Sequence, residues 1–200
     1  MFVTDPDGQN VIKFEDRNGN FVNVNSTSAA GDPLDIAASA DGSRVFVTRD
    51  EGTVIALDAH TLAMLGSSVG VGKSPWGLAV SPDSKRVFVA SFTNANLPVF
   101  HTDTLTPLPG SPVDVGPHPT VVAASLDGEF VFVATGGPSL AVVHADTLLP
   151  IPGSPFGLAG TSTMSVAVSP NISRFFRACA DARDGWFESY TLAYSPVTGS

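Results

Sequence analysis

The side chains best able to support ligand chemistry lie in short segments that each precede a recurring serine. Asp35 and His118 have the residue types of a general base and of the group that orients it, which a water-activating hydrolase needs. An indole and two hydroxyls occupy corresponding segments, at Trp76, Thr120 and Ser165. Pockets for small polar or carbohydrate-like ligands combine an aromatic wall with a few placed polar groups. These five are therefore our candidate ligand-binding residues, with Asp35 and His118 as the candidate catalytic pair.

The five candidates occupy corresponding positions of an internal repeat, although they lie far apart in the sequence. The repeat is anchored by a serine in a turn that carries an acidic or amide residue: Ser39, Ser81, Ser125 and Ser169. The candidates precede that serine by four residues (Asp35, Ser165), five (Trp76, Thr120) or seven (His118). Variable positions on a constant scaffold are where a binding site is built, although loops also vary without functional reason.

Short apolar strands on both sides of the anchor serine define the fold. The strand before it has a central alanine in every copy: Ala37, Ala79, Ala123 and Ala167. The strand after it has a central phenylalanine, and the start of the chain fits the same pattern: Phe2, Phe46, Phe88, Phe132 and Phe176. A third apolar strand and a weaker, more polar fourth strand follow. Four strands per unit of 42 to 44 residues predict an all-β fold, a β-propeller of four-stranded antiparallel blades.

The blade count predicts one partial propeller domain over residues 1–200, with four to five blades. The expected blades are 1–29 (partial), 30–69, 70–114, 115–158 and 159–200. The first lacks its innermost strand, and the last ends before it could supply one, so we expect a fragment of a longer propeller. A compact five-bladed ring with an imperfect join is the alternative.

Three stretches resemble known propeller repeats. Residues 75–90, PWGLAVSPDSKRVFVA, resemble the YVTN-type repeat, and residues 3–21 are similar to NHL-type repeats. Residues 104–134, with their Pro-Gly-Ser-Pro linker, resemble the lactonase-type seven-bladed propellers, a group that includes 6-phosphogluconolactonase-like proteins. The resemblance implies a seven-bladed parent and lactone hydrolysis as one activity. Its motifs define blades, and no catalytic motif of the group transfers to particular residues here.

The net charge and the hydropathy of the sequence argue against two kinds of partner, nucleic acids and the interior of a membrane. The net charge is −9, from 19 acidic and 10 basic residues, and Lys and Arg do not cluster. Nucleic-acid binding needs a basic face, so it is not expected. No apolar stretch reaches the ~18 residues of a membrane-spanning helix, and no basic segment followed by an apolar run predicts a signal peptide. The sequence does not decide the cellular compartment. A cytoplasmic location is compatible with it, and so is export if the chain is shortened at its N-terminus.

The sequence predicts neither a metal nor a cofactor. The four histidines are dispersed, and His101 and His144 occupy the same turn position in successive copies, which is typical of a structural residue. Cys179 is the single cysteine, and a lone cysteine is usually a small buried apolar residue. The segment 72–74, Gly-Lys-Ser, lacks the preceding glycine of a phosphate-binding loop and leads into a strand.

Three functions are compatible with this sequence. The first is a scaffold that binds a small ligand or a protein partner. The second is a lactone hydrolase of the 6-phosphogluconolactonase-like type, and the third is a structural repeat module of a cell-surface protein. An enzyme needs several ionisable groups that converge where the innermost strands begin, so the arrangement of Asp35 and His118 distinguishes the alternatives.

Overall fold

The strands form five antiparallel sheets, which we call A to E in chain order. The computed structural model describes residues 1–157, 162–168, 174–180 and 186–191, and the regular structure of these residues is all β. Sheet A contains β1 (Phe2–Asp5), β2 (Asn10–Arg17) and β3 (Asn20–Ser28). Sheet B contains β4 (Pro33–Ala38), β5 (Arg44–Arg49), β6 (Thr53–Asp58) and β7 (Val69–Gly70). Sheet C contains β8 (Pro75–Val80), β9 (Arg86–Ser91), β10 (Asn96–Leu97), β11 (Val99–His101) and β12 (Val113–Asp114).

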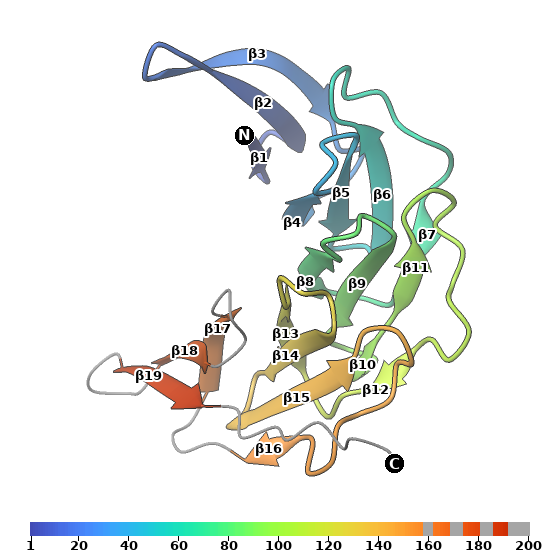
Figure 1. The fold of residues 1–200 in the computed structure, drawn as a ribbon. Helices are drawn as coiled ribbons and strands as arrows, with labels where there is room; N and C mark the ends of the chain where they lie inside the picture. The colour runs from blue at the N-terminus through green and yellow to red at the C-terminus, as the bar shows by residue number, and fades with distance from the viewer. Residues whose placement is uncertain (158–161, 169–173, 181–185, 192–200) are drawn as a thin grey trace.

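Sheets D and E continue the series. Sheet D contains β13 (Pro119–Ala124), β14 (Phe130–Thr135), β15 (Ser139–His144) and β16 (Phe156–Gly157), and sheet E contains β17 (Ser162–Val168), β18 (Arg174–Ala180) and β19 (Trp186–Thr191). The sheets follow one another along an arc (Figure 1). Their innermost strands lie side by side, because β4 contacts β8, β8 contacts β13, and β13 contacts β17.

The register of these sheets confirms the predicted repeat. In sheet B, Phe46 pairs with Ala37 on one side and Ala56 on the other. The same alanine–phenylalanine pairing recurs in the next three sheets: Ala79 with Phe88, Ala123 with Phe132, and Ala167 with Phe176. In sheet A, Phe2 lies on the first of three strands, as expected for a blade without its innermost strand in the described residues.

The repeated phenylalanines of sheets B, C and D each pack into the interface with the next sheet. Phe46, Phe88 and Phe132 are fully buried. Their apolar neighbours across the interface are Val87 and Val89 in sheet C, Val131 and Val133 in sheet D, and Val166 in sheet E, respectively. The core is therefore a row of apolar layers between neighbouring sheets, which explains why the strands are apolar on both faces.

The anchor serine closes the turn between the first two strands of a sheet. The hydroxyl of Ser39 donates a hydrogen bond to Oδ1 of Asp41 at 2.6 Å, and the N–H of Arg44 donates to that hydroxyl at 3.0 Å. The same contacts recur at Ser81 with Asp83 and Arg86, and at Ser125 with Asp127 and Phe130. The bond from the Ser39 hydroxyl, together with bonds from the N–H and hydroxyl of Ser43, lowers the pKa of Asp41 to about 2. The Ser-x-Asp element is thus a structural turn motif.

The outer strands are short because loops take over their hydrogen bonds. The outermost strands β7, β12 and β16 have two residues each. In the Pro-Gly-Ser-Pro linkers the hydroxyls of Ser111 and Ser154 accept hydrogen bonds from the N–H groups of Val99 and Val142, at 2.8 and 2.9 Å. The third strand of sheet C was expected to be continuous, but it splits into β10 and β11. Pro98 lies at the break and has no N–H to donate to the ladder.

Candidate functional site

The candidate residues lie at one end of the sheets. Each innermost strand begins beside the end of the second strand, as the pairing of Pro75 with Ser91 shows for sheet C. The segments that precede the innermost strands and the loops between second and third strands therefore share this end, which we call the rim. The anchor-serine turns lie at the opposite end of the first two strands.

Residues from neighbouring sheets meet in pairs along the rim. In each pair a loop between the second and third strands of one sheet contacts the residue seven before the anchor serine of the next sheet. Between sheets A and B, Nε2 of Gln9 donates to Oδ1 of Asp32 at 2.6 Å. Between sheets B and C, the hydroxyl of Ser74 donates to Oδ1 of Asp50 at 3.2 Å. Between sheets C and D the pair is aromatic, because the ring of Phe92 lies against the imidazole of His118.

An aromatic stack of Trp76, Phe92 and His118 distinguishes the C–D interface. The rings of Trp76 and Phe92 are stacked, with centroids 5.0 Å apart and an interplanar angle of 18°. The centroids of Phe92 and His118 are 4.7 Å apart, with the rings tilted by 34°. Trp76 is 52% exposed, His118 is exposed, and Phe92 between them is half-buried. The stack therefore presents an aromatic surface to solvent at the rim.

The backbone holds the stack in place. The N–H of Phe92 donates to the carbonyl of Ser74 at 3.3 Å, and the N–H of Gly136 donates to the carbonyl of His118 at 2.7 Å. His118 has a φ of 54°, a left-handed conformation that is uncommon for a residue with a side chain. Trp76 is the extra residue of a β-bulge, since the register of β8 with β9 shifts between Pro75 and Gly77. Bulges re-aim side chains, which accounts for the exposure of Trp76.

Asp35 connects sheets B and C. Its Oδ1 accepts the N–H of Ile36 at 2.8 Å, and its Oδ2 accepts the N–H of Leu78, on β8 of the next sheet, also at 2.8 Å. Burial raises the pKa of this carboxyl, although the bonds from Ile36 and Leu78 oppose the shift. Each oxygen thus binds a backbone donor on an innermost strand. In the part of the chain that the structure describes, no hydrogen bond or ion pair joins Asp35 to His118.

The two hydroxyl candidates lie apart from the stack. The hydroxyl of Thr120 donates to the carbonyl of Ala134 at 3.2 Å, so it is bonded within sheet D. Ser165 lies exposed on β17, where the register with β18 shifts between Thr163 and Ser165. Of the five candidates, the structure brings together Trp76 and His118, through Phe92. A single site formed by all five stays a prediction.

Phe92 is the functional candidate that sequence reasoning missed. It follows the last residue of the second strand, where the other sheets have Asp50 and Gly136. This position breaks the repeat in the same way as the candidate positions do, so the signal was present in the sequence. Phe92 lies in the loop after β9, outside the segments before the anchor serine, and it faces His118 only across the interface between two sheets.

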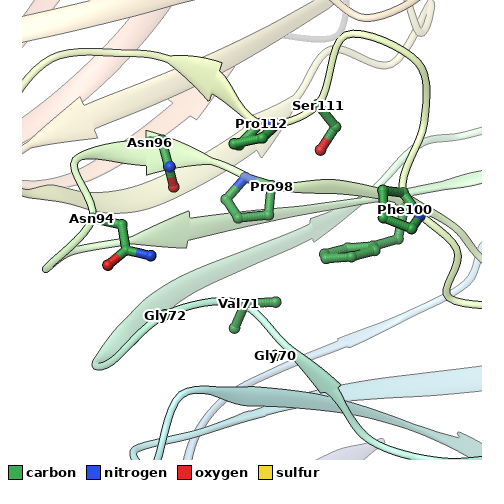
Figure 2. Close-up of a pocket in the computed structure, with 10 residues that line it drawn as sticks. Gly70, Val71, Gly72, Asn94, Asn96, Pro98, Phe100, Ser111 and Pro112 are labelled. Carbon is green, nitrogen blue, oxygen red and sulfur yellow. The ribbon is translucent and has the colours of Figure 1, made fainter.

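A separate groove lies between sheets B and C and contains none of the five candidates (Figure 2). Its volume is about 250 Å³. Val71, Pro98 and Phe100 form an apolar part, and Asn94 and Asn96 lie at the other side, near Gly72 (Figure 2). Oδ1 of Asn96 is buried and accepts no hydrogen bond from the described residues, but it is not accessible from the groove. The groove therefore combines an apolar part with the exposed amide of Asn94.

The described residues contain neither a cluster of metal-binding side chains nor a membrane-spanning helix. No group of three or more His, Cys, Asp or Glu side chains there could hold a metal ion. None of those residues belongs to a helix long and apolar enough to cross a membrane.

The solved structures that are similar to this chain include the following two. Hydrazine synthase from Kuenenia stuttgartiensis matches with a TM-score of 0.74 and 21% sequence identity, over 80% of this chain and 46% of that chain. Dihydro-heme d1 dehydrogenase NirN, solved in complex with DHE, matches with a TM-score of 0.74 and 19% identity, over 96% of this chain and 41% of that chain. Both are β-propeller proteins. The chain has the β-propeller fold.

The similarity is confined to the fold. The propeller spans less than half the length of either structure, and both identities are too low to transfer a function. No protein-family model matches the sequence, and no curated protein matches it. The side chains of the rim are therefore the features of this chain that bear on its function.

Proposed function

We propose that this propeller is a binding scaffold and that the aromatic stack of Trp76, Phe92 and His118 binds the face of a sugar ring. The observation that supports the proposal is the exposure of the stack, since Trp76 is 52% exposed although it is one of the largest apolar side chains. Large exposed aromatic side chains in contact with one another mark interaction surfaces.

The chemistry of the stack suits a carbohydrate better than a flexible chain. A pyranose ring has one apolar C–H face, which packs on an indole, and hydroxyls at its edge, which need hydrogen-bond partners. His118 adds an imidazole at one end of the stack, and the hydroxyl–carboxylate pair of Ser74 and Asp50 lies at the preceding interface. Ser74 connects the two regions, because its carbonyl accepts the N–H of Phe92.

The hydrogen bonds of Asp35 favour binding over lactone hydrolysis. A general base must be directed at a water molecule beside the substrate, whereas the carboxylate of Asp35 is partly buried between two sheets, where it is held by the N–H groups of Ile36 and Leu78. His118, its proposed orienting partner, stacks on Phe92. We also propose that the scaffold is related to the YVTN-type and lactonase-like propellers. Residues 1–200 form a single partial propeller domain in this proposal.

The test is a binding titration with neutral oligosaccharides. Trp76 and Trp186 are the two tryptophans of the chain, so a ligand on the stack is expected to change the fluorescence of the wild type and to leave Trp76→Phe nearly unchanged. Isothermal titration should then show that Trp76→Ala and Phe92→Ala weaken binding by about tenfold or more, a loss of about 1.4 kcal/mol each. The matched control is Phe21→Ala, which removes an equally exposed aromatic ring (61%) outside the rim.

Two outcomes would contradict the proposal. One is a panel of neutral and charged oligosaccharides in which none binds the wild type. The other is a saccharide that binds the wild type, Trp76→Ala and Phe21→Ala with equal affinity, since its site would then lie elsewhere. Hydrolysis of a lactone that Asp35→Asn abolishes would favour the enzymatic alternative.

A further inference from the structure

Strand β3 differs from the other outer strands in the length of its free edge. It is the last strand of sheet A in the order β1-β2-β3 and has nine residues, whereas β7, β12 and β16 have two each. Together with β2 it forms a long hairpin that extends from the arc (Figure 1). Asn18 and Gly19 have positive φ values of 58° and 82° and form its two-residue turn.

The outward backbone groups of β3 have no partner strand. Within the described residues β3 pairs with β2 alone. In an antiparallel ladder, alternate residues direct their N–H and C=O groups away from the partner strand. Counting from the hairpin turn, where Arg17 pairs with Asn20, the outward residues of the outer half are Phe21 and Asn23. This edge is therefore a template for one more strand.

The side chains of β3 do not protect this edge. Proteins usually block a free edge with a charge, a proline or a very short strand, but the segment 20–28, NFVNVNSTS, contains neither a charged residue nor a proline. Its one protective feature is a bulge, because the register with β2 shifts between Lys13 and Phe14. The part beyond the bulge carries exposed apolar side chains, with Phe21 61% and Val22 38% exposed.

We propose that the outer half of the β3 edge pairs with the same edge of a second copy of this chain, antiparallel about a two-fold axis. A self-complementary contact of this kind puts uncharged residues opposite uncharged residues, so the two copies do not repel each other at the edge. It also places side chains of the second copy beside Phe21 on one face of the sheet and Val22 on the other, which removes part of their exposed apolar surface from water. A two-fold pairing uses each edge once and closes, so it yields a dimer.

The experiment is sedimentation velocity over a concentration series of the whole chain. The wild type is expected to dimerise as its concentration rises. Asn23→Lys places a charge on the edge and, across the two-fold axis, opposite a second charge, so it should raise the dimer dissociation constant by about tenfold or more. Asn23→Pro removes the outward N–H without removing a bond to β2, and it should have the same effect. Ser67→Lys, in an exposed loop, is the matched control and should leave the constant unchanged.

Three outcomes contradict the proposal. The first is a wild type that stays monomeric over the whole concentration series. The second is a dimer that survives Asn23→Lys and Asn23→Pro, since its interface then lies elsewhere. The third is a dimer that Ser67→Lys weakens as much as Asn23→Lys does, because added charge alone then explains the loss. Circular dichroism and thermal unfolding of each variant establish that the hairpin still folds.

Discussion

The B–C and C–D interfaces share one backbone arrangement and differ in side chains at two places. At the innermost strands, the carboxylate of Asp35 accepts the N–H of Leu78 across the B–C interface. The corresponding residue at the C–D interface is Gly77, where an added Cβ would lie 2.5 Å from the carbonyl of Thr120 and 3.0 Å from the nitrogen of Val122. One interface is bridged by a side chain, and the other is closed by direct backbone contact.

The rim shows the second difference. The hydrogen bond between Ser74 and Asp50 at the B–C interface corresponds to the contact between His118 and Phe92 at the C–D interface. Equivalent backbone positions thus carry a small polar pair in one place and an exposed aromatic pair in the other. The scaffold and the site are therefore specified by different residues, so each can be altered without the other.

The largest effect is expected from filling the space at Gly77. Gly77→Val should lower the free energy of unfolding by about 3 kcal/mol, because the atoms within 3.0 Å of the added Cβ belong to the backbone of β13, which cannot move aside cheaply. Chemical denaturation measures this loss. Gly70→Val is the control, since nothing lies within 4 Å of a Cβ there. Equal losses in both variants would show that β-sheet packing at Gly77 is looser than described.

Removing the bridge at the B–C interface is expected to cost somewhat less. Asp35→Ala leaves the N–H groups of Ile36 and Leu78 without acceptors in a partly buried place, at a cost of about 2 kcal/mol. Asp35→Asn keeps one acceptor oxygen and should recover part of that stability. The measurement is again denaturation. If Asp35→Ala were as stable as the wild type, the bridge would contribute nothing, and Asp35 would be free for another role.

Exchanging the rim chemistry tests the separation of scaffold and site. The double variant Phe92→Asp, His118→Ser gives the C–D rim the residue types of Asp50 and Ser74. It should lower the free energy of unfolding by about 2 kcal/mol, the contribution of the two aromatic contacts that Phe92 makes with Trp76 and His118. It should also abolish saccharide binding. Calorimetry measures both quantities, and a variant that unfolds at room temperature or still binds the sugar would contradict the separation.

The smallest effect is a difference in pH dependence. Burial raises the pKa of Asp35 in the folded state, so the folded chain holds a proton there more tightly than the unfolded chain does. The resulting contribution to stability is present below the unfolded pKa and is lost as the pH rises through the folded pKa. Asp35→Asn should remove this decrease, whereas Gly70→Ala, where nothing lies within 4 Å of the added Cβ, should leave it unchanged. Urea unfolding between pH 3 and pH 6 tests this by comparing how the free energy of unfolding of each variant changes with pH.

Asp41 gives the opposite slope and serves as an internal reference. Its pKa is lowered to about 2 by the Ser39 hydroxyl and its neighbours. The stability it contributes is therefore present above the unfolded pKa and is lost as the pH falls toward 2. Asp41→Asn should make the folded state less sensitive to acid, and an unchanged acid transition would show that the turn bonds do not depend on the charge.

The scaffold could be predicted from the sequence because its determinants lie close together in the chain. The alanine and phenylalanine of one repeat are paired residues of adjacent strands, nine residues apart, as in Ala37 and Phe46. The candidate site was predicted only in part. Trp76 and His118 were expected to lie close together because they occupy the segments before the anchor serines of successive repeats. Phe92, which contacts both rings, comes from a loop in another part of the repeat.

The partner of Asp35 could not be predicted for a physical reason. Its carboxylate binds an N–H that is free only because β8 is an innermost strand, and the distance from Asp35 to Leu78 is set by the packing of two sheets. A similar limit applies to β3. The sequence predicts an outer strand there, but the length of its unpaired edge depends on how far the hairpin extends beyond sheet B.

The Ser-x-Asp turn has a consequence for how such a chain can change in length over evolution. Each turn is closed by residues of its own repeat, as Ser39, Asp41 and Arg44 show. Each repeat also contributes to the apolar layers on both faces of its sheet. In sheet C, Phe88 packs into the layer shared with sheet D, and Val87 and Val89 pack into the layer shared with sheet B. A duplicated gene segment of 42 to 44 residues would therefore encode a unit that fits between existing neighbours without any compensating mutation. New binding specificity could then arise by substitution at a few rim codons in the extra copy.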